Sequence, residues 1–406
     1  MNLTEIRSQF PALSAQVYGK PLVYLDNAAT AQRPLSVEEA WRHSVETANA
    51  NIHRAVHYLA GAATDAYESA RESVRAFLNA ALKEEIVFTS GATLGINLVA
   101  HAFGEAFVGE GDEVIVSVDG HHSNIVPWQL LCGRKKAVLK VIDIHENGSL
   151  AVEDLEKIIS RRTKIVAISH ISNVLGLINP VREIVEICHR HDVPVLVDGA
   201  QGIVHAPVDV QALDCDFYVF SGHKLYAATG TGVLYGKKKW LEAMPPFLSG
   251  GEMIHTVRFD GTTFAPLPFK FEAGTQHING VPTWEPALAF VRTCREQPEV
   301  EAEQAAILDY VYEKLTEDER ITLYGVPRGT KIPLFSFAVR GVHHEDLALL
   351  LDKMGIAVRS GQMCAEPLMD RLGVSGLLRA SFAPYNTLAE AESFIAGLHK
   401  AINMLV

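Results

Sequence analysis

The sequence predicts an α/β protein built on a large, mostly parallel sheet, because continuous apolar runs alternate with helical stretches over roughly 200 residues. Five of these runs lack the polar–apolar alternation of a half-exposed strand, which is typical of strands buried on both faces. They are residues 86–89, 113–118, 165–168, 195–197 and 218–220. We therefore predict a sheet that is covered by helices on both sides.

Two helices between these strands have recognisable beginnings. Ser36-Val37-Glu38-Glu39 has the pattern of a capping box, in which a hydroxyl and a carboxylate satisfy free amides at the helix start. Asn179-Pro180 offers a cap residue followed by a proline that suits the first turn. Both patterns predict a helix where the alternation with strands requires one.

After about residue 285 the pattern becomes that of a smaller α+β domain. A helical stretch leads to the following elements: a strand near 333–339, a helix near 345–354, strands near 356–359 and 377–381, and a closing helix after the capping box Thr387-Leu388-Ala389-Glu390. The 406 residues suggest two or three domains. We predict an N-terminal segment over 1–20 that packs with the small domain, a large domain over 21–285 and a small C-terminal domain over 286–406.

Charge and hydropathy limit the class of protein. The formal net charge is −12, and no basic run is longer than Lys237-Lys238-Lys239. Because phosphate backbones and anionic membranes need clustered cations, we expect neither nucleic acid nor a membrane surface as a partner. No apolar run approaches the ~18 residues that span a bilayer. The first residues also lack the basic segment and apolar core of a signal peptide.

The five cysteines are scattered and do not form a disulfide framework, so we expect a cytoplasmic protein. Four of them lie in helical or strand-like surroundings, where cysteine packs as a small hydrophobe. These four are Cys132, Cys188, Cys215 and Cys294. Cys364 instead lies on the loop Arg359-Ser360-Gly361-Gln362-Met363-Cys364-Ala365-Glu366-Pro367, and loops are where reactive groups concentrate. Arg359 and Arg379 are candidates to stabilise its thiolate.

Three loops after predicted strands carry polar groups. Ser90-Gly91-Ala92-Thr93-Leu94-Gly95 opens a helix, where small residues either let amides approach a phosphate or simply allow a tight turn. Asp198 ends a strand, where an acid often only caps the next turn. Lys224 follows another strand, where a lysine is usually a solvated charge. Together, Asp198 and Lys224 match the needs of pyridoxal phosphate, whose ring nitrogen is kept protonated by a carboxylate and whose aldehyde reacts with a lysine.

The 17 histidines raise the question of a metal. His121-His122 and His343-His344 are adjacent pairs, whose side chains point in different directions on a strand or helix. No His-Glu-x-x-His and no paired Cys-x-x-Cys pattern occurs, so we predict no metal site. His121 follows a strand, where it either lies flat against a planar cofactor or makes the ordinary hydrogen bonds of a turn.

Six segments, taken in order, resemble the signatures of the class V aminotransferase superfamily and, within it, of the group II cysteine desulfurases of the Suf and Csd type. The segments are Leu25-Asp26-Asn27-Ala28-Ala29-Thr30, His121-His122-Ser123-Asn124, Asp198-Gly199-Ala200-Gln201, Ser221-Gly222-His223-Lys224, Glu272-Ala273-Gly274-Thr275 and Arg379-Ala380-Ser381. The resemblance covers essentially the whole chain. It implies the fold-type I architecture of pyridoxal 5'-phosphate (PLP) enzymes, with the cofactor in the large domain and the Cys364 loop in the small one. It also implies a homodimer with sites at the subunit interface.

The resemblance assigns roles around the cofactor. Lys224 would hold PLP covalently and later move protons, and Asp198 would pair with the pyridine nitrogen. Gln201 would bond the ring hydroxyl, and His121 would stack on the ring as a catalytic and cofactor-binding residue. The residues that would bind the phosphate are Thr93, Ser221, His223 and, from the partner subunit, Thr275.

The resemblance also implies a substrate site and an activity. Arg379 and Asn173 would hold the substrate carboxylate, with Ala28 and Arg359 completing the substrate site. Cys364 would attack the sulfur of L-cysteine, leaving L-alanine and a persulfide on Cys364. The persulfide would pass to a sulfur-acceptor protein that serves iron–sulfur cluster assembly or related sulfur metabolism. Selenocysteine lysis is the expected second activity, and cysteine sulfinate is a further candidate substrate.

Three positions depart from the pattern of these relatives. Leu94 stands where many have a glutamate, so an interface role of that acid is absent. Ala227-Ala228 replaces the usual Gly-Pro after the lysine motif, which would shift that loop slightly. Gln362-Met363 replaces a frequent pair of histidines before Cys364, so a proton role for those histidines cannot be assumed.

Two rival interpretations remain open. One is another PLP enzyme of the same superfamily, such as a selenocysteine lyase, a cysteine sulfinate desulfinase, a kynureninase or an aminotransferase. Lys224 and Asp198 are common to all of these, so only Cys364 and its loop discriminate. The other is a PLP-binding scaffold that has lost catalysis, against which the intact Lys224, Arg379 and Cys364 argue.

Overall fold

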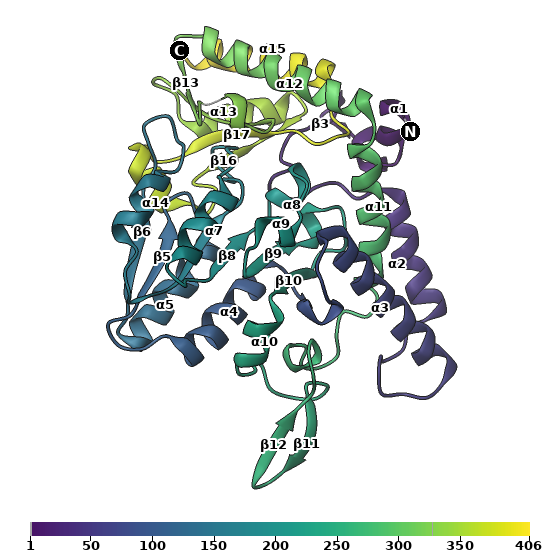
Figure 1. The fold of residues 1–406 in the computed structure, drawn as a ribbon. Helices are drawn as coiled ribbons and strands as arrows, with labels where there is room; N and C mark the ends of the chain where they lie inside the picture. Colours follow the sequence, from purple (N-terminus) through teal and green to yellow (C-terminus); the bar gives the residue numbers. More distant parts are fainter. Residues whose placement is uncertain (1, 327) are drawn as a thin grey trace.

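The central element of the structure, a computed structural model that describes residues 2–326 and 328–406, is a seven-stranded sheet. Its strands lie in the order β4-β10-β9-β8-β7-β5-β6 (Figure 1). Their bounds are Ile86–Thr89 for β4, Glu113–Ser117 for β5, Val138–Ile142 for β6, Thr163–Ser169 for β7, Val195–Asp198 for β8, Phe217–Ser221 for β9 and Gly232–Gly236 for β10. All neighbours are parallel except β10, which is antiparallel to β4 and β9. The prediction of a large, mostly parallel sheet is confirmed.

Successive residues of the buried strands pack into two different cores, one on each face of the sheet. In β7, Ile165 and Ala167 join the core that contains α4 (Ala92–Phe107) and α5 (Val126–Lys135). Val166 and Ile168 join the core of the opposite face. Because both faces are covered, apolar side chains occupy every position of such a strand, and the five predicted strands are all observed.

Two strands of this sheet were not predicted. β6 is an edge strand with partly exposed residues, so its sequence Val-Leu-Lys-Val-Ile mixes a charge into the apolar run. β10 begins and ends with glycine, and glycine weakens a strand signal. Gly232 is required there, because a Cβ at this position would lie 2.4 Å from the Cα of Gly91.

Both predicted helix starts in the large domain are wrong in detail. Helix α2 (Leu35–Thr47) begins two residues earlier than a cap at Ser36 predicts, with Pro34 at the N-cap, and no side chain caps it. The amide of Leu35 instead donates to the carbonyl of Gln9. Helix α7 (Val181–Arg190) has Pro180 at its N-cap, and the side chain of Asn179 turns inward to Asp119 and the Ser169 carbonyl. Tertiary partners therefore replace the local caps.

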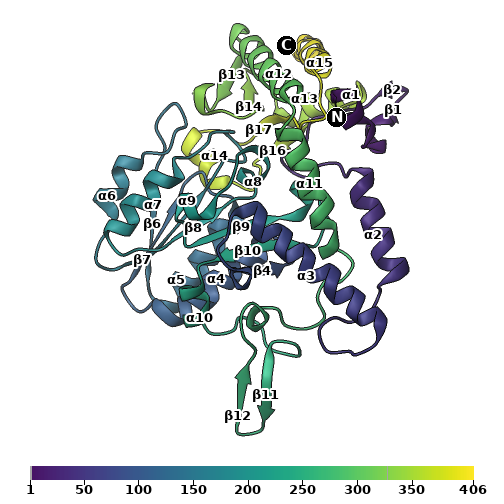
Figure 2. The same ribbon diagram turned by 45° about the vertical axis from the view of Figure 1, so that its right-hand side comes forward.

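The C-terminal part forms a four-stranded antiparallel sheet with helices packed on it (Figures 1 and 2). Its strands, in spatial order, are β13 (Ile321–Tyr324), β14 (Leu334–Val339), β17 (Leu377–Ser381) and β16 (Arg359–Gly361). The helices are α12 (Pro298–Glu317), α13 (His344–Lys353) and α15 (Leu388–Leu405). The predicted capping box of Thr387 and Glu390 is present at the start of α15. Helix α11 (Trp284–Arg295), at the predicted boundary, packs on α2 and α3 (Tyr58–Leu78) of the large domain.

The N-terminal residues lie against this C-terminal part. Strand β3 (Val23–Tyr24) pairs in parallel with β15 (Ile356–Ala357). Arg7, in α1 (Leu3–Ser8), forms an ion pair with Glu390 at 2.7 Å. These contacts place the chain just before Asp26 beside the strand that leads into the Cys364 loop.

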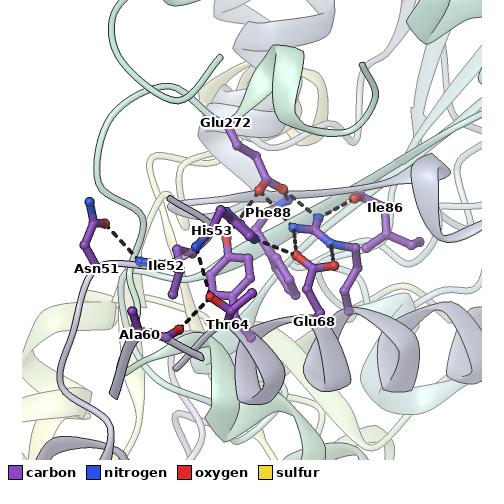
Figure 3. A network of polar contacts seen from close by, with 11 residues as sticks. Asn51, Ile52, His53, Ala60, Thr64, Glu68, Ile86, Phe88 and Glu272 are labelled. Carbon is purple, nitrogen blue, oxygen red and sulfur yellow. Dashed lines mark hydrogen bonds and ion pairs between the residues drawn. The ribbon is translucent and has the colours of Figure 1, made fainter. Parts of the chain in front are cut away.

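A buried arginine holds helix α3 to the edge of the large sheet. The side chain of Arg71 is 0% exposed and forms an ion pair with Glu272 at 2.7 Å. Figure 3 shows the carboxylates of Glu68 and Glu272 pointing toward one another from two different segments. The Oε1 atom of Glu272 also accepts the amide hydrogen of Phe88 in β4. The network therefore fixes the segment that carries Glu272-Ala273-Gly274-Thr275.

A two-stranded hairpin projects away from the rest of the molecule in both ribbon views (Figures 1 and 2). It is formed by β11 (Ile254–Arg258) and β12 (Gly261–Phe264). Among the described residues, no helix combines the length and the apolar character needed to cross a membrane.

Candidate active site

A cavity of about 270 Å³ lies at the carboxyl ends of the parallel strands and is closed on one side by the small domain. Almost all residues predicted for the site line it. These are Ala28, Thr93, His121, Asn173, Asp198, Gln201, Ser221, His223, Lys224, Arg359, Cys364 and Arg379. The structure thus brings together side chains that the sequence separates by up to several hundred positions. Their individual roles remain predictions.

The cavity is lined by an acid, the buried Asp198, and by an amine, the half-buried Lys224. Asp198 is the last residue of β8, and its Oδ1 accepts the amide of Ala200 at 3.0 Å. Lys224 follows β9 in a short 3₁₀ turn. Burial lowers the pKa of Lys224 to about 8, although the nearby Asp198 carboxylate works in the opposite direction. Burial raises the pKa of Asp198, and the cationic Lys224 opposes that shift.

One end of the cavity is the N-terminus of helix α4. Gly91 stands at the N-cap with φ of 151° and offers no side chain to cap the free amides. The Oγ of Ser221 accepts the amide of Ala92 at 2.8 Å and so ties the helix to the end of β9. His223 contacts the hydroxyl of Thr30 through Nδ1 at 3.1 Å. Free amides, small hydroxyls and a histidine at the start of a 16-residue helix suit a phosphate.

His121 lines the cavity from the loop after β5. Its Nδ1 contacts the Oγ of Ser123 at 2.8 Å, which fixes the orientation of the ring. Burial and the positive charge of Lys224 lower the pKa of His121 to about 4, so the ring is neutral at neutral pH. Gln201 donates from Nε2 to the carbonyl of Ala28 at 2.8 Å. The neutral imidazole of His121 fits the predicted stacking role, and the fixed carboxamide of Gln201 fits the predicted role of binding the ring hydroxyl.

Arg379 enters the cavity from β17 of the small domain. Its guanidinium donates from Nη1 to the carbonyl of Asn173 at 2.7 Å and from Nη2 to Asp26 at 3.2 Å. The Nε of Arg379 is buried and has no partner among the described residues. Arg359 shares the same Asp26 at 3.4 Å. A buried guanidinium with a free N–H group provides a place for a substrate carboxylate.

The Cys364 loop closes the cavity on the small-domain side. Cys364 is exposed, whereas the four other cysteines are buried, as predicted. Met363 and Cys364 have φ angles of 54° and 56°, in the left-handed region that non-glycine residues rarely occupy. The amide of Asn173 donates from Nδ2 to the carbonyl of Met363 at 2.9 Å. Asn173 therefore contacts the loop as well as the cavity.

Comparison with known proteins agrees with this geometry. The family described as "Aminotransferase class-V" matches residues 23–394. A protein from Halalkalibacterium halodurans, described as "Probable cysteine desulfurase", is 48% identical over 98% of each chain. "Cysteine desulfurase" from a strain of Escherichia coli is 44% identical over 100% of this chain and 99% of its own length. The chain belongs to the cysteine desulfurases of the class-V aminotransferase family.

Solved structures of this family have the same fold. The cysteine desulfurase CsdA from Escherichia coli superposes with a TM-score of 0.91 at 40% identity, over 100% of each chain. The apo cysteine desulfurase from Thermococcus onnurineus NA1 superposes with a TM-score of 0.93 at 35% identity, over 100% of this chain and 99% of the other. These matches confirm the prediction of a PLP-enzyme fold.

PLP is the cofactor of this family, and the cavity fits it. Asp198, Lys224 and the free amides of α4 supply a carboxylate, an amine and a phosphate cradle in one place. The unpartnered Nε of Arg379 leaves a donor for the substrate. The predictions of a PLP-dependent enzyme and of its cofactor are confirmed.

Thr275 is the one predicted site residue that does not line the cavity. It is exposed and follows the Glu272 segment that Arg71 holds in place. Its predicted role requires the partner subunit and stays a prediction.

Sequence reasoning missed several residues that complete the site. Asp26 bridges Arg379 and Arg359, and His122 contacts the Cys364 loop. Thr30 and Ser123 orient His223 and His121. Asp26 and His122 lie inside recognised segments, so the neighbouring residues indicated that this part of the chain reaches the site. Their partners, however, come from the small domain and are not visible in the sequence.

Proposed function

We propose that this enzyme converts L-cysteine to L-alanine and places the released sulfur on Cys364 as a persulfide. The observation that carries the proposal is that one cavity is lined by both Lys224 and an exposed cysteine. A cofactor-binding lysine alone is common to many reactions. A thiol that lines the same cavity supplies a nucleophile for a sulfur atom.

Lys224 and Asp198 prepare the reaction at the cofactor. When bound, PLP supplies an electron sink that stabilises negative charge next to the substrate's α-carbon. Asp198 would pair with the ring nitrogen and favour its protonated form. Lys224, with a pKa of about 8, can both accept and return a proton near neutral pH. His121, whose pKa is lowered to about 4, stays neutral and would stack on one face of the ring.

Arg379 and Asn173 orient the substrate. Arg379 keeps its positive charge at neutral pH and lines the cavity, and its Nε has no partner among the described residues. Asn173 holds the Arg379 guanidinium through its carbonyl and the loop of Cys364 through its side chain. The substrate carboxylate and the attacking thiol are thus positioned by one residue of the large domain.

Cys364 completes the sulfur transfer. Its thiolate attacks the substrate Sγ, so that an S–S bond forms and the Cβ–Sγ bond breaks. Cβ keeps the electron pair of the broken bond and takes up a proton to become the methyl group of alanine. No external oxidant is needed, because the sulfur is oxidised while the carbon is reduced.

The persulfide then requires an acceptor. Cys364 is exposed, which suits transfer to a second protein for iron–sulfur cluster assembly or a related sulfur pathway. The proposal includes a cytoplasmic homodimer, in which Thr275 reaches the phosphate of the partner's site. It also includes selenocysteine lysis, because selenide is the better leaving group.

The test is alanine release from L-cysteine with a reductant, for enzymes of equal PLP content. We expect Cys364→Ala to abolish release and the matched control Cys132→Ala, a buried cysteine, to retain it. Release that survives in Cys364→Ala would contradict the persulfide route. It would favour a lyase whose substrate loses its group without a thiol, which activity on L-selenocysteine would identify.

A further inference from the structure

We propose that His122 is a positioning residue that holds the Cys364 loop of the small domain against the large domain. The inference rests on the proposed function of Cys364 as the sulfur nucleophile. His122 lies beside His121 in the sequence, but the two rings serve different parts of the molecule. Their centroids are 6.3 Å apart with an interplanar angle of 51°, and only His121 lines the cavity.

The Cys364 loop cannot keep its conformation by local preference. Two consecutive non-glycine residues, Met363 and Cys364, occupy the left-handed region. Each such residue is disfavoured, because its Cβ crowds the following carbonyl oxygen. Within the loop, the Ala365 amide donates to the Gln362 carbonyl at 3.0 Å, which closes only a single turn. Bonds from outside the loop must therefore hold it.

His122 provides two of these outside bonds. Its backbone amide donates to the carbonyl of Cys364 at 2.8 Å. Its Nε2 accepts the backbone amide of Glu366 at 3.1 Å. The third comes from Asn173, which donates to the Met363 carbonyl. His122 and Asn173 thus bind the carbonyls of residues 363 and 364 and the amide of residue 366, which lie on both sides of the Cys364 thiol in the sequence.

The side-chain bond of His122 has a specific chemical requirement. Glu366 is the first residue of helix α14 (Glu366–Leu372), and no side chain of the helix's own N-cap, Ala365, satisfies its amide. The imidazole supplies the missing acceptor, which requires a neutral ring with its proton on Nδ1. The Glu366 carboxylate lies 3.8 Å from the same Nε2.

The bond between His122 and Glu366 lies near the surface beside Cys364 and is not part of the hydrophobic core. The side chain of His122 is 34% exposed and that of Glu366 is 57% exposed. The 3₁₀ turn that contains His122 (His122–Asn124) is held in place without the imidazole, because Asn124 accepts the indole N–H of Trp128. Removing the ring of His122 should therefore loosen the loop without unfolding the turn.

Glutamine and asparagine at position 122 distinguish the effect of losing the hydrogen bond from the effect of losing the bulk of the ring. A carboxamide oxygen at the end of glutamine reaches about as far as Nε2, whereas that of asparagine reaches only as far as Nδ1. We therefore expect His122→Gln to preserve the acceptor for the Glu366 amide. His122→Asn and His122→Ala should lose it.

The test combines hydrogen exchange with a first turnover, both on the PLP-loaded enzyme. In His122→Ala and His122→Asn, we expect amides of the peptide around Glu366 to exchange about three- to tenfold faster, as for the loss of one hydrogen bond. The first turnover of L-cysteine to alanine should slow about tenfold or more. PLP absorbance should not change, and His122→Gln should restore both quantities.

Exchange rates that are equal in wild type and His122→Ala would overturn the proposal. So would first turnovers that are equally slow in the Gln and Asn variants, because bulk and not the acceptor would then matter. Failure of the proposed function looks different. In that case wild type forms no alanine, or Cys364→Ala still forms it, while the exchange data still decide whether His122 holds the loop.

Discussion

Two clusters of charge in the molecule, one around Arg71 and one in the cavity, are built in opposite ways. Arg71 directs hydrogen bonds from Nε, Nη1 and Nη2 to Glu68, Glu272 and the Ile86 carbonyl. These partners raise its pKa above the ordinary arginine value, despite the opposing effect of burial. In the cavity, burial instead lowers the pKa values of Lys224 and Arg379.

The hydrogen-bond donors of Lys224 and Arg379 in the cavity are not all paired within the described part of the protein. Among the described residues, the side chain of Lys224 makes no hydrogen bond or ion pair, and the buried Nε of Arg379 has no partner. A fully partnered charge stabilises the fold, whereas an incompletely partnered one leaves groups for a ligand. The contrast predicts that the two clusters respond differently to the loss of their central cation.

The largest effect is expected for Lys224→Ala. Activity should fall by about 1,000-fold or more, because covalent attachment and proton transfer are both lost. The apoprotein should keep its stability toward urea, since a buried amine without partners is removed. A loss of stability as large as that of an Arg71 variant would contradict the contrast between the clusters.

Arg71→Met should have the reverse effect, lowering the free energy of unfolding by about 3–5 kcal/mol because the Glu272 carboxylate is left buried without its partner. Urea denaturation of the apoprotein measures this change. The matched control is Arg75→Met, one turn along the same helix, whose exposed pair with Glu72 should contribute no more than about 1 kcal/mol. Equal losses in both variants would show that burial of Arg71 does not matter.

The low pKa of Lys224 predicts a pH dependence of cofactor attachment. Only the neutral amine reacts with an aldehyde, so the rate of PLP attachment to the apoprotein should rise with pH and level off above about 8. Asp198 favours the ammonium form, so Asp198→Asn should move the midpoint to lower pH. Stopped-flow absorbance measures the rate, and a midpoint near the ordinary lysine pKa would contradict the account.

The smallest effect is expected for Asp26→Asn. Asp26 bridges Arg379 and Arg359, so its loss should misalign the carboxylate-binding arginines without removing either. We expect KM for L-cysteine to rise about three- to tenfold, with kcat nearly unchanged. Steady-state kinetics test this, and a fall in kcat at constant KM would place Asp26 in the chemical step instead.

The sequence predicted the elements whose side chains have a single, local environment and missed those that depend on distant partners. The five strands buried on both faces gave unbroken apolar runs, while the edge strand β6 and the glycine-bounded β10 did not. The caps expected at Ser36 and Asn179 failed, because partners distant in sequence decide how those helices begin.

The cavity residues were predictable because each lies in a short recognisable segment at a strand end. The Arg71 cluster was not, since Arg71 and Glu272 are 201 residues apart and neither lies in a pattern that specifies the other. The contacts of His122 with Glu366 are invisible in the sequence for the same reason, since the two residues are 244 positions apart.

The most direct test of the central claim is the mass of the peptide that contains Cys364. The PLP-loaded enzyme is treated with L-cysteine in the absence of reductant and acceptor, then digested. We predict one added sulfur atom on Cys364, in proportion to the alanine released, and none on this peptide in Lys224→Ala. Alanine released without sulfur on Cys364 would contradict the account.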